Sequence, residues 1–311
     1  MIKNFDELME KAKNVDKKKV SVAVAQDKEV LKAVQAAHRM GIADSILVGD
    51  EEKIREIGKE LDMRFDEYEI IDVKDPIEAA HEAVKQVHEG KADMYMKGLI
   101  ETKDFLRSVL DKEVGLRSGR PLSHVCVFEI KGAQKLLFLT DVAFVPYPTL
   151  EDKVNIIENT IEICNACGIE NPKVAPIAAV EVVNPKMPVT VEAAELTKMN
   201  EEGKIPGCIV DGPLSLDLAT VPEAAEAKGA TGRKIVGDAD ILLFPDIHAG
   251  NITYKAIEHF AEVKNGNLIT GTAAPVVLTS RSDSFEVKTR SLALGALVAD
   301  SLKKKNASKN K

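Results

Sequence analysis

The sequence lacks the features that define several common classes of protein. It has no tryptophan, and aromatic residues make up only 4% of its 311 residues. No run approaches the roughly 18 consecutive apolar residues of a membrane-spanning helix. The N-terminal segment MIKNFDELMEKAKNV is charged throughout and has no apolar signal-peptide core. We therefore expect a cytoplasmic protein whose aliphatic core favours helices packed on a buried sheet.

Cofactor and metal motifs are also missing. The chain contains no dinucleotide-binding GxGxxG, no phosphate-binding GxxxxGK[ST] and no GxSxG nucleophile turn. The carboxylates Asp211, Asp217 and Asp246 do not have the spacing of an HExxH-type metal site. We expect no metal and no bound cofactor, which argues against a dehydrogenase. The missing GxSxG argues against an α/β hydrolase.

A basic surface for nucleic acid is absent as well. The formal net charge is -8, and the only basic cluster lies in residues 303–311, where a solvated and frayed chain end explains it. Binding to nucleic acid needs clustered lysine and arginine. We therefore expect small-molecule substrates as partners, with no nucleic acid and no membrane.

The four cysteines suit a reducing compartment. Cys164 and Cys167 form a CxxC, but Cys126 and Cys208 are isolated, so no second pair completes a zinc site. The CxxC closes a predicted helix, whereas a redox motif opens one. We interpret these residues as buried or half-buried thiols.

What the sequence does contain is an alternation of short apolar runs and amphipathic segments. Strands are predicted near residues 20–25, 45–49, 68–73 and 92–96, with helices between them. This alternation is typical of βαβ units around a parallel sheet. Residues 124–130 and 135–140 then predict an antiparallel hairpin, and the βα alternation resumes near residue 150. The length predicts two domains.

Val145-Pro-Tyr-Pro148 breaks regular structure and predicts the point where the chain crosses between domains. The last predicted helix, near 284–304, has enough apolar surface to need an established core. We therefore expect a first α/β domain of residues 1–145 completed by 270–311, and a second α/β domain of residues 146–269.

Polar residues follow several predicted strands, where open α/β sheets place ligands. They are Met96-Lys97-Gly98, Thr140-Asp141, Asp211-Gly212-Pro213 and Pro245-Asp246-Ile247-His248. A simple turn explains Asp211-Gly212-Pro213 equally well.

Residues 238–255, DADILLFPDIHAGNITYK, have the order strand, small-residue loop and helix. We expect Asn251 to cap that helix, near Gly250 and Thr253. Backbone N–H groups at such a helix start bind anions such as phosphate.

A second candidate anion site is PVVLTSRSD, residues 275–283, just before the last predicted helix. Helix capping explains the hydroxyl groups here without any ligand. Arg281 is different, because a cation at the positive end of a helix is electrostatically misplaced. This misplacement favours a bound anion.

Three long motifs stand out, namely DGPLSLDLA from Asp211, ADILLFPDIHAGNITYKA from Ala239 and PVVLTSR from Pro275. Together they resemble the phosphate acetyl/butyryltransferase family. The similarity covers essentially the whole chain. KGLIETKDFLRSVL from Lys97 and SGRPLSHVCVFEI from Ser118 look more like the butyryl branch than the acetyl branch.

The resemblance implies two α/β domains of the isocitrate/isopropylmalate dehydrogenase type, an active site in a cleft between them, and a homodimer or higher homo-oligomer. It also implies the reversible reaction of butyryl-CoA and phosphate to butyryl phosphate and CoA. CoA and phosphate are then substrates, and no cofactor is needed. By position, Ser280 and Arg281 match the family's catalytic pair, and Arg107 resembles an arginine that holds phosphate or CoA.

One position departs from the family pattern. The acetyl branch has an aspartate six residues after the catalytic arginine, assigned as the base for the CoA thiol, and this chain has Val287 there. Either Asp283 takes over, or CoA enters as thiolate and no base is needed. The acetyl-transferring reaction and a non-catalytic CoA- or phosphate-binding protein remain the alternatives to butyryl transfer.

Overall fold

The computed structural model describes residues 2–309 and divides into two compact units. The N-terminal unit contains Phe5–Arg120 and the residues from Asn265 onward, and the central unit contains Pro121–Lys264 with the residues up to Asn4. The division falls at 120/121 and 264/265, whereas the sequence placed it at 145/146 and 269/270. The hairpin belongs to the central unit because its second strand pairs there with a later strand.

The N-terminal unit is built on six strands in the order β3-β2-β1-β4-β11-β10. Neighbouring strands are parallel except β10 and β11, which are antiparallel. The strands are β1 (Lys18–Ala23), β2 (Ala43–Gly49), β3 (Glu69–Asp72), β4 (Met94–Lys97), β10 (Val263–Thr270) and β11 (Val276–Val277).

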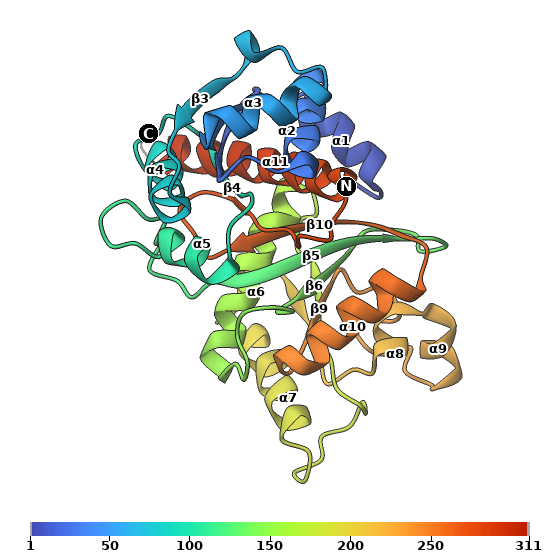
Figure 1. Ribbon diagram of the computed structural model, residues 1–311. Helices are drawn as coiled ribbons and strands as arrows, with labels where there is room; N and C mark the ends of the chain where they lie inside the picture. Colours follow the sequence, from blue (N-terminus) through green and yellow to red (C-terminus); the bar gives the residue numbers. More distant parts are fainter. Residues whose placement is uncertain (1, 310–311) are drawn as a thin grey trace. The chain divides into compact units, whose positions relative to one another are not determined.

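Helices connect and cover these strands. They are α1 (Phe5–Lys13), α2 (Lys28–Arg39), α3 (Glu51–Glu60), the 3₁₀ turn η1 (Phe65–Glu67), α4 (Pro76–His88), α5 (Thr102–Val109) and α11 (Phe285–Lys309). Helix α11 lies beside α1 and α2 although it comes from the other end of the chain (Figure 1). The last helix therefore completes the N-terminal unit, where its apolar surface is buried on the sheet.

The central unit is built on five strands in the order β5-β6-β9-β7-β8. Strands β5 (Ser123–Ile130) and β6 (Leu137–Thr140) form the predicted antiparallel hairpin, and the remaining pairs are parallel. The others are β7 (Lys173–Pro176), β8 (Ile209–Val210) and β9 (Ile241–Leu243). The helices are α6 (Leu150–Ala166), α7 (Pro188–Glu201), α8 (Leu216–Thr220), α9 (Pro222–Ala227) and α10 (Ile247–Phe260).

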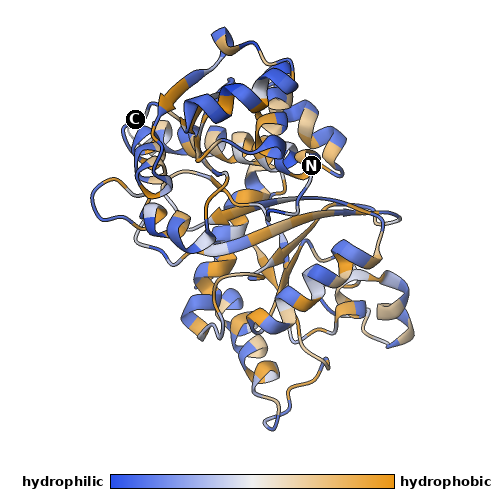
Figure 2. Cartoon of the chain, in the orientation of Figure 1, coloured by the Kyte–Doolittle hydropathy of each residue, from blue (hydrophilic) through white to orange (hydrophobic). Residues whose placement is uncertain are grey.

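The strands of both units are mainly hydrophobic, whereas a helix such as α3 is mainly hydrophilic (Figure 2). This distribution follows from strands that are buried under helices. The predicted α/β fold with an aliphatic core is therefore confirmed.

The predicted start of α10 is wrong. The helix begins at Ile247, and its N-cap is Asp246, whose carboxylate accepts the Ala249 N–H at 3.0 Å. Asn251 lies inside the helix and donates its side-chain amide to the Val142 carbonyl at 2.9 Å. The predicted turn at 248–251 is helical because Gly250 packs on the segment after β6, where an added Cβ would lie 2.3 Å from the Asp141 carbonyl oxygen.

The CxxC prediction is confirmed. Cys164 lies in the last turn of α6 and Cys167 caps that helix, and all four cysteines of the chain are buried thiols. Burial raises the pKa of Cys164, with further contributions from Cys167 and Asp240. A thiol in this state is a poor nucleophile and a poor metal ligand.

Candidate active site

Three strands of the N-terminal unit end side by side, and predicted site residues lie at or after the ends of two of them, β4 and β11. Lys97 is the last residue of β4, and it pairs with Ala23 at the end of β1. On the other side Met96 pairs with Val277 at the end of β11. Because these strands are parallel, their carboxyl ends lie at one edge of the sheet, where open α/β sheets bind ligands.

The backbone at this edge is tightly packed. Val24 has a φ of 56°, a left-handed conformation that a β-branched residue rarely adopts. Its carbonyl accepts the Leu99 N–H at 2.8 Å, and a Cβ on residue 98 would lie 2.3 Å from the same oxygen. Only glycine fits at position 98. Backbone strain of this kind gathers at functional sites.

The predicted residues Ser280, Arg281 and Asp283 form a turn between β11 and α11. The Asp283 carboxylate accepts the Ser280 N–H at 2.7 Å, and the Ser280 carbonyl accepts the Asp283 N–H at 3.2 Å. Lys288 in the first turn of α11 donates to the carbonyl oxygens of Ser280 at 3.0 Å and Asp283 at 2.8 Å. The turn is thus held at both ends, with the Ser280 hydroxyl and Arg281 exposed.

This turn and the end of β4 line a small hollow that opens to solvent. Its walls come from the ends of β4 and β11, the start of α2 and the start of α11. The lining residues are Asp27, Val30, Lys97, Gly98, Leu99, Thr279, Ser280, Arg281 and Lys288.

Lys97 places a buried positive charge at the hollow. Its side chain is buried, yet within residues 2–309 it makes neither an ion pair nor a hydrogen bond that would compensate its charge. Burial lowers the pKa of Lys97, and the positive charges of Arg281 and Lys288 lower it further. A buried lysine is normally paired. An anion entering the hollow would supply the missing partner.

Arg281 is available to such an anion. Its guanidinium contacts the Glu101 carboxylate at 2.7 Å, and the two side chains are 59% and 71% exposed. An exposed ion pair contributes only about 0–1 kcal/mol. A ligand can therefore replace Glu101 at little cost.

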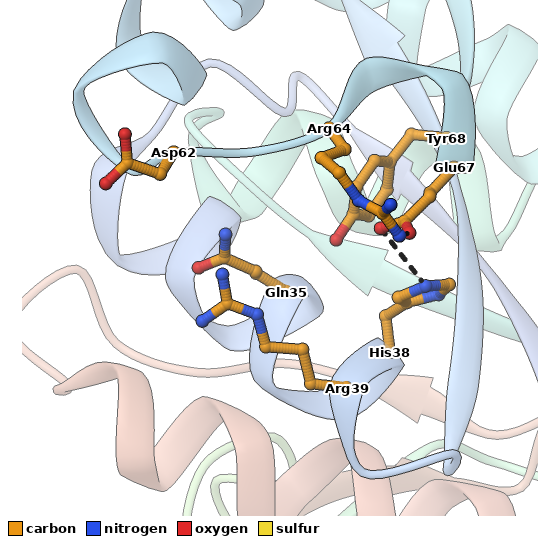
Figure 3. Close-up of a pocket in the computed structure, with 7 residues that line it drawn as sticks. All are labelled: Gln35, His38, Arg39, Asp62, Arg64, Glu67 and Tyr68. Atoms are coloured by element: carbon orange, nitrogen blue, oxygen red, sulfur yellow. Dashed lines mark ion pairs between the residues drawn. The ribbon is translucent and has the colours of Figure 1, made fainter.

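The N-terminal unit also has a larger pocket of about 360 Å³ (Figure 3). Its lining residues are Gln35, His38, Arg39, Asp62, Arg64, Glu67 and Tyr68, and none of them was predicted from the sequence. Glu67 pairs with Arg64 and lies 3.4 Å from Nε2 of His38, and Nδ1 of His38 lies 2.7 Å from Asp44. The lining of this pocket contains carboxylates as well as cations, so it needs an anion less than the hollow around Lys97 does.

The predicted Arg107 lies on α5 in the N-terminal unit. Its side chain is 66% exposed and contacts Asp104, three residues earlier, at 3.1 Å. It does not line the hollow. The structure shows an accessible guanidinium there, and its role in binding phosphate or CoA stays a prediction.

In the central unit, Thr140 ends β6 and is buried. Its hydroxyl donates to the His124 carbonyl at 3.1 Å. The next residue, Asp141, accepts the N–H groups of residues 143, 144 and 145 at 2.8 to 3.1 Å. These groups hold the loop after β6 by contacts within the protein.

Asp211, which follows β8, is buried and engaged by Arg233. The Arg233 guanidinium donates to the Asp211 carboxylate at 2.6 and 3.2 Å, and the Ile235 N–H donates at 3.0 Å. The carboxylate thus fixes the segment between α9 and β9. This geometry supports the turn interpretation of the sequence more than a contact to substrate.

His248 lies in the first turn of α10 and is exposed, and its Nε2 is 3.1 Å from the Tyr147 hydroxyl. Thr253 is partly exposed on the same helix. Asn251 and Gly250 instead pack the helix on the segment after β6. The Ala249 N–H is taken by Asp246, so fewer backbone donors remain for an anion than the sequence suggested.

Within residues 2–309, no group of three or more His, Cys, Asp or Glu side chains could hold a metal ion. No helix in the described part of the chain is long and apolar enough to cross a membrane.

Sequence reasoning missed Lys288. In a helix with charged residues on both sides it reads as an ordinary surface lysine, but it is only 3% exposed. The one available signal was its place in the first turn of a helix, where the helix dipole disfavours a cation.

Comparison with known proteins identifies the family of this chain. The family model described as phosphate acetyl/butaryl transferase matches residues 4–79 and 76–296. The phosphate butyryltransferase of Clostridium beijerinckii is 55% identical over 299 residues, which cover 96% of this chain and 99% of that protein. The chain therefore belongs to the phosphate acetyl/butyryltransferase family. It is a phosphate acyltransferase.

Solved structures show the same relationship. A branched-chain phosphotransacylase from Enterococcus faecalis superposes with a TM-score of 0.81 at 37% identity, covering 90% of this chain and 98% of that one. A 4-hydroxythreonine-4-phosphate dehydrogenase from Klebsiella pneumoniae has a TM-score of 0.53 at 11% identity, covering 91% and 99%. The second likeness concerns the fold alone, and it confirms the predicted dehydrogenase-like α/β fold.

Proposed function

We propose that the chain transfers a butyryl group between CoA and phosphate, in the reversible reaction butyryl-CoA + phosphate = butyryl phosphate + CoA. The observation that carries this proposal is the buried, uncompensated ammonium of Lys97 beside the Ser280–Arg281 turn. The identity to a phosphate butyryltransferase over nearly the whole chain supports the acyl group.

In the direction that consumes butyryl phosphate, the CoA sulfur attacks the acyl carbonyl. The new C–S bond forms, the C–O bond to phosphate breaks, and phosphate leaves. Negative charge grows on the carbonyl oxygen and on the leaving phosphate. Arg281 and Lys97 would stabilise this charge by charge-assisted hydrogen bonds, and the Ser280 hydroxyl would add a neutral donor.

Asp283 is proposed as the base that takes the thiol proton. Its place on the same turn as Ser280 and Arg281 supports this role. Its carboxylate is buried and already accepts the Ser280 N–H, so it also holds the turn. The alternative is that CoA enters as thiolate, and Asp283→Asn, which keeps the turn and removes the base, distinguishes the two.

Direct transfer is favoured over an acyl-enzyme on a cysteine. Burial raises the pKa of Cys208 to about 11 and raises the pKa of Cys164 as well. The thiolate is the nucleophile, and these thiols form it poorly at neutral pH. A thiol-alkylating reagent should therefore leave turnover intact.

Residues of the central unit serve two proposed roles. Side chains that are accessible on α10 are proposed as substrate contacts, and side chains engaged within the protein are proposed to shape the loops. The first group is His248 and Thr253, and the second is Thr140, Asp211, Gly250 and Asn251. Arg107 is proposed as a further contact to phosphate or CoA.

The assembly and the compartment are also proposals. A homodimer or higher homo-oligomer is proposed from the family resemblance, and light scattering on the purified chain measures it. A cytoplasmic location is supported by four buried thiols, since disulfides form in oxidising compartments.

The test is the phosphate-dependent release of CoA from acetyl-, butyryl- and branched-chain acyl-CoA. We expect the highest kcat/KM for butyryl-CoA. One methylene group in an apolar pocket is worth about 1–3 kcal/mol, so the preference over acetyl-CoA should exceed about tenfold. A higher kcat/KM for acetyl-CoA would favour phosphate acetyl transfer, and no CoA release from any of them would refute the enzymatic function.

A further inference from the structure

We propose that Lys288 is a phosphate-binding residue of this site, acting beside Lys97, in addition to holding the turn that carries Ser280 and Arg281. The proposal rests on the proposed phosphate acyl transfer and names a second buried cation that serves it.

The first observation is the way Lys288 is held. It is 3% exposed, and its ammonium donates to the carbonyl oxygens of Ser280 at 3.0 Å and Asp283 at 2.8 Å. A lysine ammonium has three N–H donors. Two are used by these carbonyls, and Lys288 also lines the hollow, so its third donor is placed to serve a ligand there.

The second observation is the balance of charge around the hollow. Three of its lining residues are cations, namely Lys97, Arg281 and Lys288, and one is a carboxylate, Asp27. The Asp27 carboxylate accepts the Val30 N–H at 2.9 Å and thereby caps α2. The lining residues thus carry two more positive charges than negative ones. Inorganic phosphate near pH 7 is a mixture of its singly and doubly charged anions, and its oxygens accept hydrogen bonds from cationic donors.

The contrast with another buried lysine shows that this arrangement is unusual. Lys18, also in the N-terminal unit, is 2% exposed and contacts the Asp300 carboxylate at 2.9 Å. Lys97 and Lys288 have no such ion pair within residues 2–309, and the nearby carboxylates, such as Asp27, act on them only at longer range. Burying an ammonium without a counterion is costly. Two such lysines that line one hollow indicate a counterion that comes from solution.

The position of Lys288 in the chain agrees with this. It lies in the first turn of α11, where the helix dipole disfavours a cation. A lysine needed only to hold two carbonyls could be replaced by a neutral donor. The positive charge at this point is explained by an anion that binds next to it.

The experiment compares Lys288→Met, which removes the charge and the donors, with Lys288→Gln, which keeps a neutral N–H donor. We expect KM for phosphate to rise about 10-fold or more in both variants, because each loses a hydrogen bond from a charged donor. KM for butyryl-CoA should stay within about threefold. Lys18→Met is the matched control, and its KM for phosphate should not change.

A purely structural role predicts a different result. In that case the KM of Lys288→Gln for phosphate would lie within about threefold of the wild-type value. Alternatively, KM for phosphate and KM for butyryl-CoA would rise together in Lys288→Met. Either outcome overturns the proposal. Calorimetric titration of the same variants with inorganic phosphate gives the same comparison without turnover. If the wild-type chain binds phosphate but releases no CoA, the proposed function fails while the assignment of Lys288 is still tested.

Discussion

Arg281 is the residue on which the proposed chemistry depends most directly. Its guanidinium is the exposed cation of a turn that is otherwise fixed by Asp283 and Lys288. Its exposed contact with Glu101 adds little to stability. Fixed donors that meet charge only in the transition state typically contribute 10²–10³ in kcat.

Arg281→Ala should therefore lower kcat by about 10²–10³ while the free energy of unfolding changes by less than about 1 kcal/mol. Steady-state kinetics and urea unfolding measure the two quantities. Arg55→Ala, which removes another partly exposed arginine of the N-terminal unit, is the control and should retain full turnover. Near-normal turnover of Arg281→Ala would remove it from the mechanism.

Asp283 can be tested separately because asparagine keeps the acceptor for the Ser280 N–H. If the carboxylate is the base, Asp283→Asn should lose rate most strongly at low pH, where little CoA thiolate is present. The measurement is kcat/KM for CoA as a function of pH. An equal loss at every pH would leave Asp283 only its role in the turn.

His124 makes the central unit sensitive to acid. It is buried on β5, and its Nδ1 has no hydrogen-bond partner among residues 2–309. Burial lowers the pKa of His124 to about 4, with a smaller effect of Lys255. The unfolded chain takes up a proton near pH 6.5 and the folded chain does so only near pH 4, so stability falls as the pH drops through this range.

His124→Phe should remove this dependence. The wild-type chain should lose up to about 3 kcal/mol of unfolding free energy relative to the variant between pH 6.5 and 4. Urea unfolding across this pH range measures the difference. His259→Gln, at a 68% exposed position of the same unit, should behave like the wild type. Parallel pH curves for wild type and His124→Phe would contradict the expectation.

At the scale of elements, the motif Asp211-Gly212-Pro213 after β8 has a structural role. Asp211 joins this strand end to the segment before β9 through Arg233 and the Ile235 N–H. Removing one partner of a buried pair leaves the other charge uncompensated, which typically costs 3–5 kcal/mol. Arg233 is 24% exposed, so the cost here should be smaller.

Arg233→Ala should lower the free energy of unfolding by about 2–3 kcal/mol, measured by urea denaturation. Lys234→Ala removes the neighbouring exposed ion pair with Glu201 and should change stability by less than about 0.5 kcal/mol. If both substitutions have the same small effect, the Asp211–Arg233 pair does not hold this segment.

At the scale of the whole molecule, phosphate should stabilise the folded chain. A ligand that binds only the folded state adds about 2.7 kcal/mol when its concentration is 100 times its Kd. Thermal unfolding with increasing inorganic phosphate should show a rise in Tm that is largely lost in Lys97→Met. Lys18→Met should keep the phosphate-dependent rise although its own Tm is lower, because it leaves Asp300 without its buried partner. An equal rise in all three proteins would reflect a general salt effect.

Much of the fold could be predicted because its signals are local. Short apolar runs and amphipathic periods located most strands and helices, and the hairpin of β5 and β6 followed from its spacing. Helices α1 and α8 were not predicted. The start of α10 was placed too late, because Gly250 and Asn251 resemble a turn locally, whereas packing on Asp141 and Val142 makes them helical.

The sequence by itself determined the α/β class, the family and the turn that carries Ser280, Arg281 and Asp283, because these depend on contiguous residues. Only the tertiary structure decided which charges are compensated. Asp211 is neutralised by Arg233, whereas Lys97 and Lys288 meet at one hollow without a carboxylate in ion-pair contact. These residues are far apart in the chain, and burial and pairing are set by packing, which no local pattern records.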